Sequence, residues 1–202
     1  MSLLDVKYSS IFPISVHNIS INGFDEIKNE LIKYAYNLKN TDPNGVQKSN
    51  YGGWHSALTI IDNSDNILQK LLIQSIQSLP IHKSYLIHVS YWVNINPPKS
   101  YNSKHNHPAS DLSGVLWLKS PENCGNIVFE NPFIFQDFKS INSYTQEYKE
   151  ANNQYFSYDF TAEEGTMIVF PSHLQHKVRE NQSNEDRISV SFNLSLTQDK
   201  SV

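Results

Sequence analysis

The spacing of apolar residues changes once along the chain, near Pro80, from a helical period to the alternation of β-strands. On the N-terminal side, apolar residues recur every three or four positions over 24–39, which predicts an amphipathic helix closed by a turn at 42–45. A second apolar stripe predicts a helix over 67–79, with Ser64 as its N-cap and Pro80 beyond its end. The N-terminal part is therefore expected to supply helices and the remainder strands.

The C-terminal part alternates apolar and polar residues, a pattern typical of two-faced strands. The longest such run covers 84–96 and is stopped by Pro97-Pro98. A short strand is also expected at 11–16, and 49–56 and 134–153 are expected to be loops, the second lying over one edge or mouth. Further strands are predicted at 103–107, 114–119, 126–130, 155–160, 166–170, 176–179 and 187–196.

Helices followed by a run of short strands predict an α+β, mainly β, fold. Two N-terminal helices are expected to support one face of an antiparallel double sheet, and a jelly-roll arrangement fits this order best. The 202 residues, of which 39% are hydrophobic, suffice for one domain with a proper core. We expect it to span 1–202, with a helical support region at 1–80 and a jelly-roll core at 84–196.

Charge and composition narrow the classes of function. The net charge is −4 and the lysines and arginines are scattered, so nucleic acid is not an expected partner. The one cysteine, Cys124, excludes an internal disulfide and is in keeping with a reducing compartment. A long apolar segment is not found either, so no membrane association is expected and the predicted location is the cytoplasm.

Two histidines, His105 and His107, stand two residues apart directly before an apolar strand. In an extended chain, residues i and i+2 point to the same face, so both imidazoles could bind one metal ion. We expect the third ligand to be His176, because a strand resumes there after a bend at 170–172, although His173 competes for this role. Non-haem iron is commonly held by two histidines and a carboxylate, with positions left open for a co-substrate and oxygen.

The strand expected at 187–196 has one polar and one fully apolar face, which predicts a wet cavity on its polar side. Arg187 and Ser189 share that polar face. An arginine facing such a cavity needs an anion, and its planar fork suits a carboxylate in two-point contact. The alternative is that Arg187 only pairs with an acidic neighbour at the preceding turn, namely Glu180, Glu185 or Asp186.

Six short fragments follow one another along the chain in an order that carries a family resemblance. They are His105-Asn106-His107, Ser113 to Leu118, Gly125 to Phe129, Gly165 to Ser172, His176-Lys177-Val178 and Arg187 to Asn193. Together they resemble the 2-oxoglutarate- and Fe(II)-dependent oxygenases. They are most similar to the prolyl-hydroxylase-like branch and to a small group of that superfamily found in marine bacteria and phages. The resemblance covers roughly the last half of the chain.

This resemblance implies a double-stranded β-helix, or cupin-like, core and an enzyme that uses Fe(II), 2-oxoglutarate and O₂, with ascorbate as a further candidate cofactor. It implies hydroxylation of a C–H bond in a peptide or protein, such as a prolyl residue, or in a small molecule. Succinate and CO₂ would be released, and the protein would supply positioning and exclusion of water. A phage-encoded protein of this kind would work in the host cytoplasm.

The resemblance also implies roles for individual residues. The pair of the first motif and the distal histidine would bind iron, while the far carboxylate of 2-oxoglutarate would bind Arg187 and Ser189. Further candidates are Tyr91 and Asn94 for contact with the co-substrate, and Trp92 and Trp117 for the wall of the substrate site.

The sequence departs from the family pattern at one position. The family has His-x-Asp or His-x-Glu, whereas His107 occupies the carboxylate position here. A three-histidine site, a site in which Asp111 folds back to replace His107, and a site with two histidines and water are the three alternatives. Two other functions compete as well: a non-catalytic metal-binding jelly-roll module, and a three-histidine cupin-type dioxygenase without 2-oxoglutarate, which a surface location of Arg187 would favour.

Overall fold

The computed structural model describes residues 12–62, 66–133 and 140–200. Its helices are α1 (Phe24–Thr41), α2 (Ile67–Gln77), α3 (Ser140–Ser143) and α4 (Gln146–Ala151). Its strands are β1 (His17–Ser20), β2 (Asn50–Tyr51), β3 (Trp54–His55), β4 (Thr59–Ile60), β5 (Tyr85–Asn96), β6 (Tyr101–His105), β7 (Leu112–Lys119), β8 (Ile127–Glu130), β9 (Ser157–Phe160), β10 (Thr166–Pro171), β11 (His176–Val178) and β12 (Arg187–Gln198).

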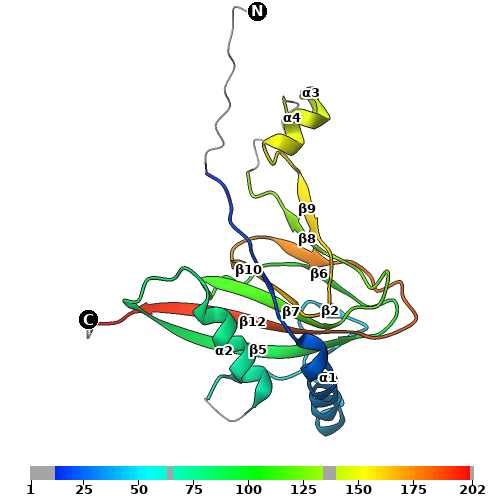
Figure 1. The fold of residues 1–202 in the computed structure, drawn as a ribbon. Coiled ribbons are helices and arrows are strands. Elements are labelled where there is room, and N and C mark those ends of the chain that lie inside the picture. Colours follow the sequence, from blue (N-terminus) through cyan, green and yellow to red (C-terminus); the bar gives the residue numbers. More distant parts are fainter. Residues whose placement is uncertain (1–11, 63–65, 134–139, 201–202) are drawn as a thin grey trace, which may run out of the picture.

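The strands form two antiparallel sheets (Figure 1). The larger sheet has the order β1-β10-β7-β12-β5-β3, with β4 also paired to β5, and the smaller sheet has the order β2-β6-β11-β8-β9. Neighbours in each sheet are mostly distant in sequence, as in a jelly roll. The predicted mainly β, double-stranded β-helix fold with N-terminal helices is confirmed.

Helices α1 and α2 pack on the outer face of the larger sheet. Their predicted apolar stripes supply Leu31, Ala35, Leu68 and Leu72, each 0% exposed, to a core shared with that sheet. No helix in the described ranges is both long and apolar enough to cross a membrane.

The two faces of strand β12 contact different parts of the structure, as its alternation predicts. Its apolar row, which includes Val190 and Phe192, is fully buried in the core beneath the helices. Its other row faces the space between the sheets, where Arg187, Ser189 and Ser191 line a cavity. A second apolar cluster, built around Trp117, Phe129 and Phe170, fills the rest of that space.

The N-terminal half differs from the sequence-based expectation in its strands. The segment 12–16 is irregular and the first strand begins at His17, where pairing with β10 starts. The expected loop at 49–56 contains β2 and β3, which pair with β6 and β5. Such short strands carry no periodicity of their own, because pairing with a distant strand creates them.

Two helical details also differ. Helix α2 is capped by Asn66, whose side chain accepts hydrogen bonds from the backbone N–H groups of Leu68 (2.8 Å) and Gln69 (3.4 Å). The expected cap, Ser64, lies outside the described residues. Of the expected loop at 134–153, the first six positions are likewise outside them, and the remainder contains α3 and α4.

The close approach of β7 to β12 depends on Gly114, which lies opposite Phe192. A Cβ at this glycine would lie 2.2 Å from Cζ of Phe192 and 2.7 Å from the Ile168 carbonyl oxygen. We expect Gly114→Ala to lower the free energy of unfolding by about 1–3 kcal/mol, measured by chemical denaturation, because the added methyl overpacks the core. The smaller side chain of Phe192→Leu should recover part of this loss in the double variant, and a Gly114→Ala protein as stable as the wild type would contradict the packing.

Candidate active site

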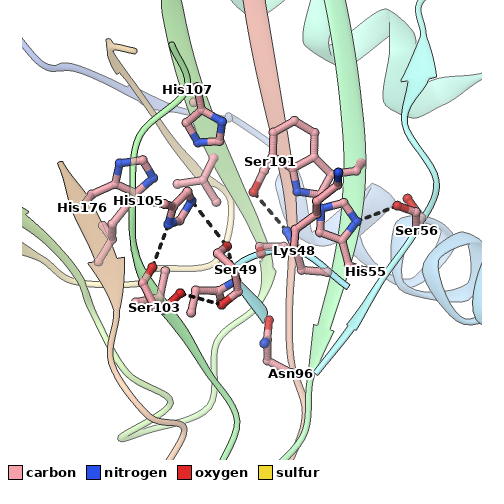
Figure 2. A pocket seen from close by; sticks show the side chains of 18 of the residues that line it. Lys48, Ser49, His55, Ser56, Asn96, Ser103, His105, His107, His176 and Ser191 are labelled. Carbon is pink, nitrogen blue, oxygen red and sulfur yellow. Dashed lines mark hydrogen bonds between the residues drawn. The ribbon is translucent and has the colours of Figure 1, made fainter. Parts of the chain in front are cut away.

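Three imidazoles from separate segments converge between the sheets (Figure 2). His105 ends β6 and is paired with His176, the first residue of β11. His107 lies beyond the end of β6, and its backbone N–H donates to the Ser172 carbonyl at 2.9 Å. One ring nitrogen from each imidazole lies within 4.8 Å of the other two, so the three residues form a group that could hold a metal ion.

Hydrogen bonds orient two of these rings. Nδ1 of His105 donates to the Ser103 carbonyl at 2.7 Å, and Nδ1 of His176 donates to the Leu174 carbonyl at 3.0 Å. In both rings Nε2 is therefore the nitrogen that carries the lone pair, and in His105 it lies 3.5 Å from the Ser49 hydroxyl. Such backbone bonds are the usual support of metal-binding histidines. The ring of His107 is instead positioned by packing, 5.7 Å from Trp92 and 5.3 Å from His176 between ring centroids.

Burial keeps these imidazoles neutral. Desolvation lowers the pKa of His105, lowers that of His107 to about 4 and lowers that of His176 to about 3, and the mutual repulsion of their protonated forms adds to the shift at His107 and His176. Neutral imidazole is the form that binds metals. The site is therefore ready for a cation at neutral pH.

Asp111 and His173, the two alternative metal ligands considered from the sequence, lie outside the group of three imidazoles. The carboxylate of Asp111 accepts a hydrogen bond from the backbone N–H of Leu196 at 2.7 Å and is not part of the imidazole group. The alternative in which Asp111 folds back to replace His107 is therefore not seen, because the carboxylate is bonded to the backbone of β12. His173 is exposed.

Arg187 is buried at 2% exposure, and its guanidinium is only partly satisfied. Nη1 donates to the backbone carbonyls of Cys124, Gly125 and Arg179. Nη2 has no hydrogen-bond partner in the described part of the chain, and desolvation lowers the pKa of Arg187 to about 10. The alternative pairing with acidic neighbours is not seen, since Glu185 pairs with Lys119. An unpartnered buried guanidinium nitrogen fits a carboxylate ligand.

The imidazoles and Arg187 line one cavity of about 710 Å³. The inner faces of β5, β7 and β12 supply the expected residues Asn94, Ser189, Trp92 and Trp117. The cavity thus connects a candidate metal site with a candidate anion site and has the size of a typical small-molecule site.

Tyr91 does not belong to this cavity, and the prediction that it touches the co-substrate is wrong. Its hydroxyl contacts that of Tyr34 on α1 at 3.2 Å and accepts from Gln69 on α2 at 3.5 Å. Residues 91 and 92 alternate in direction along β5, so the side chains of Tyr91 and Trp92 cannot both face the space between the sheets.

Two residues of the cavity were missed by the sequence analysis. His55, which lies in the segment 49–56 that was expected to be a loop, lines the cavity and stacks on Trp92 at 5.4 Å between ring centroids. Asn96 is 1% exposed and lies opposite Arg187 in the β5–β12 pair, and its Nδ2 has no partner among the described residues. The alternation that exposes Trp92 and Asn94 to the cavity also indicates Asn96, whereas no local pattern indicates His55.

A family comparison agrees with this geometry. Residues 90–193 match the model of a family described as "Putative 2OG-Fe(II) oxygenase". The chain belongs to this 2OG-Fe(II) oxygenase family. The matched segment runs from β5 to β12 and contains the three imidazoles and Arg187. Fe(II), 2-oxoglutarate and O₂ are accordingly the cofactors and co-substrates of the family to which the chain belongs.

Solved structures of oxygenases share the fold at low sequence identity. A prolyl-4-hydroxylase from Pseudomonas putida has a TM-score of 0.62 and 13% identity, covering 90% of this chain and 92% of that one. A Trichoplax adhaerens prolyl hydroxylase, solved with a hypoxia inducible factor peptide fragment, has a TM-score of 0.58 and 13% identity over 92% and 84% of the two chains. HygX from Streptomyces hygroscopicus, solved with nickel, 2-oxoglutarate and hygromycin B, has a TM-score of 0.56 and 9% identity over 90% and 83%. No curated protein matches the sequence significantly.

The depressed imidazole pKa values make the stability of the metal-free protein depend on pH. The folded-state pKa of His176 is about 3, below the ordinary value of 6.5, so below pH 6.5 the unfolded chain takes up a proton that the folded chain does not. The free energy of unfolding should therefore fall as pH drops from 6.5 towards 4, by up to about 1.4 kcal/mol per pH unit for this residue, and be independent of it above pH 7.5. Denaturation curves between pH 5 and pH 8 should show a shallower dependence for His176→Gln, and equal slopes in both proteins would contradict the assignment.

Proposed function

We propose that this protein is a 2-oxoglutarate- and Fe(II)-dependent dioxygenase that hydroxylates a C–H bond of a peptide or small-molecule substrate and releases succinate and CO₂. The observation that carries the proposal is the joint presence, in one cavity, of three neutral imidazoles and a buried guanidinium, one nitrogen of which has no partner among the residues that the structure describes. A metal and a dicarboxylate are the ligands that satisfy both groups.

His105, His107 and His176 would hold the iron. The Nε2 lone pairs of His105 and His176 and the neutral state of all three rings fit this role. When bound, Fe(II) and 2-oxoglutarate supply the oxidising power, one atom of O₂ entering succinate and the other the substrate. The protein's own residues orient the reactants and keep water away from them.

Arg187 would receive the far carboxylate of 2-oxoglutarate, with Ser189 beside it on β12. The neighbouring Asn96 offers a second buried donor, and Asn94 lies opposite Ser189 in the β5–β12 pair. Because Arg187 is anchored to three backbone carbonyls, its guanidinium is held in place before the ligand arrives, which lowers the entropy cost of binding.

The substrate would occupy the rest of the cavity, walled by Trp92 and Trp117. A ten-atom keto acid, at no more than about 30 Å³ per non-hydrogen atom, fills less than half of the 710 Å³. Room is left for one residue of a peptide or for part of a small molecule. The peptide-bound prolyl hydroxylase and the hygromycin-bound HygX show that structures with this fold accommodate either kind of molecule.

The replacement of the usual carboxylate by His107 favours one competing function, a metal-binding module without catalysis. Succinate release separates the two. We expect the Fe(II)-loaded protein to convert 2-oxoglutarate to succinate in the presence of O₂, slowly without substrate and faster with it. Retention of metal without any O₂-dependent succinate would support the non-catalytic module, whereas turnover of another substrate without 2-oxoglutarate would support a cupin-type dioxygenase.

Removing a metal ligand and removing the anion partner should have separable effects. We expect His176→Ala to abolish Mn(II) binding, and Arg187→Met to keep it while weakening 2-oxoglutarate about 10- to 100-fold through loss of charge-assisted hydrogen bonds. Isothermal titration under nitrogen measures both constants. Pyruvate, which lacks the far carboxylate, is the control ligand and should bind wild type and Arg187→Met alike. Loss of metal in both variants would contradict the assigned roles.

The role of Asn96 can be tested with its neighbour Gly53. We expect Asn96→Ala to weaken 2-oxoglutarate about three- to tenfold and to leave pyruvate unaffected, since one neutral hydrogen bond is lost. A Cβ on Gly53 would lie 2.4 Å from Nδ2 of Asn96, so Gly53→Ala should displace the amide and cause a similar loss. In the Asn96→Ala background, Gly53→Ala should add nothing, and additive losses would show that the glycine acts by another route.

A further inference from the structure

The charged residues that line the cavity are all positive. They are Lys48 and Arg187, and no Asp or Glu is found among the described lining residues. The charge of the cavity lining thus differs from that of the whole chain, which has 20 acidic and 16 basic residues and a net charge of −4. The cavity therefore attracts anions although the protein as a whole is acidic.

The two cations lie at different depths. Arg187 is 2% exposed and would be neutralised by the far carboxylate of 2-oxoglutarate, whereas Lys48 is exposed at the rim. Lys48 lines the same cavity as the imidazoles, and the hydroxyl of the next residue, Ser49, lies 3.5 Å from Nε2 of His105. Figure 2 shows Lys48 on the same side of the cavity as His55, whose pKa is lowered mainly by burial and further by the charge of Lys48. A charge at this place meets the substrate rather than the keto acid.

The buried side chain of Asn50 holds the loop that carries Lys48 through hydrogen bonds. The backbone N–H of Lys48 donates to Oδ1 of Asn50 at 2.7 Å, and Asn50 is 2% exposed. Nδ2 of Asn50 in turn donates to the carbonyls of Gly53 (2.8 Å) and Val46 (3.3 Å). The backbone at position 48 is therefore fixed relative to β2 and β3, and only the lysine side chain needs to be ordered by a ligand.

The charge of Lys48 has no internal counter-charge. Its ammonium group forms no ion pair within the described ranges, whereas Lys28, Lys104 and Lys119 each pair with a glutamate. The neutral His107 increases the imbalance, because it stands where the family pattern has a carboxylate. With Fe(II) and the dianion of 2-oxoglutarate in place, the charges of metal, keto acid, Arg187 and Lys48 sum to about +2, one unit more than with a carboxylate ligand.

From this excess we propose that the substrate is an anion that carries a carboxylate, and that Lys48 is the specificity-determining residue that binds this group. The inference rests on the proposed function, because it treats the cavity as loaded with metal and 2-oxoglutarate. A cationic substrate would meet only positive charge there, while a carboxylate gains an ion pair with Lys48 and the attraction of the metal centre.

A pair of probes with one shape and different charge tests the proposal. Benzoate and benzamide are titrated into protein loaded with Mn(II) and saturating 2-oxoglutarate under nitrogen, and the broadening of their NMR lines by Mn(II) reports their approach to the metal. The variants are Lys48→Gln, Lys48→Glu and, as a matched control, Lys33→Glu, which makes the same charge change at an exposed position of α1. The affinity for 2-oxoglutarate alone is measured first in each protein, so a failure of the proposed function is recognised separately.

We expect wild type and Lys33→Glu to broaden benzoate more than benzamide. Lys48→Gln should weaken benzoate roughly two- to fivefold and leave benzamide unchanged, and Lys48→Glu should reduce benzoate further. Doubling the 2-oxoglutarate concentration should not alter the benzoate signal. The proposal is overturned if the loaded wild type does not prefer benzoate, if Lys48→Gln leaves that preference intact, or if 2-oxoglutarate competes the benzoate away.

Discussion

The burial of one guanidinium in the space between two sheets is the constraint on which the site depends. Arg187 lines the cavity and is held by three backbone carbonyls through one nitrogen, while its second nitrogen, Nη2, is buried and has no hydrogen-bond partner among the described residues. Removing an arginine from water costs several kcal/mol unless its hydrogen bonds and its charge are satisfied. Backbone carbonyls satisfy part of the hydrogen bonding, and no acidic side chain in the described part of the chain pairs with the guanidinium. An anion that binds at this point would therefore be stabilised.

The alternation of side chains along β12 turns Arg187 toward the cavity that also contains the three imidazoles. Four apolar residues of the strand are fully buried under α1 and α2, and this fixes the register of the whole sheet, because a shift by one residue would turn them into the cavity. Arg187, Ser189 and Ser191 then have to face the second sheet, whose β6 and β11 bring His105 and His176 together. The helices, which are remote from the chemistry, thereby determine the direction of the guanidinium.

Local periodicity explains which features could be predicted from the sequence. The helix near 24–39, the long strands β5 and β12, the polar row beginning at Arg187 and the resemblance carried by six ordered fragments all depend on residues close together in the chain. The features that were missed depend on pairing between remote segments. His55 reaches the cavity only because β3 pairs with β5, and Asn96 matters only because it lies opposite Arg187. The role expected for Tyr91 failed because alternation directs it to the helices, and His107 reaches its neighbours from beyond the strand that was expected to carry it.

The central claim is that His105, His107 and His176 hold one metal ion next to a keto acid whose far carboxylate binds Arg187. A crystal structure of the protein with Mn(II) and 2-oxoglutarate, grown under nitrogen, tests it most directly. The account predicts one metal ion coordinated by all three imidazoles, with a carboxylate of 2-oxoglutarate against Nη2 of Arg187. A metal ion coordinated without His107, or a 2-oxoglutarate bound away from Arg187, would contradict it.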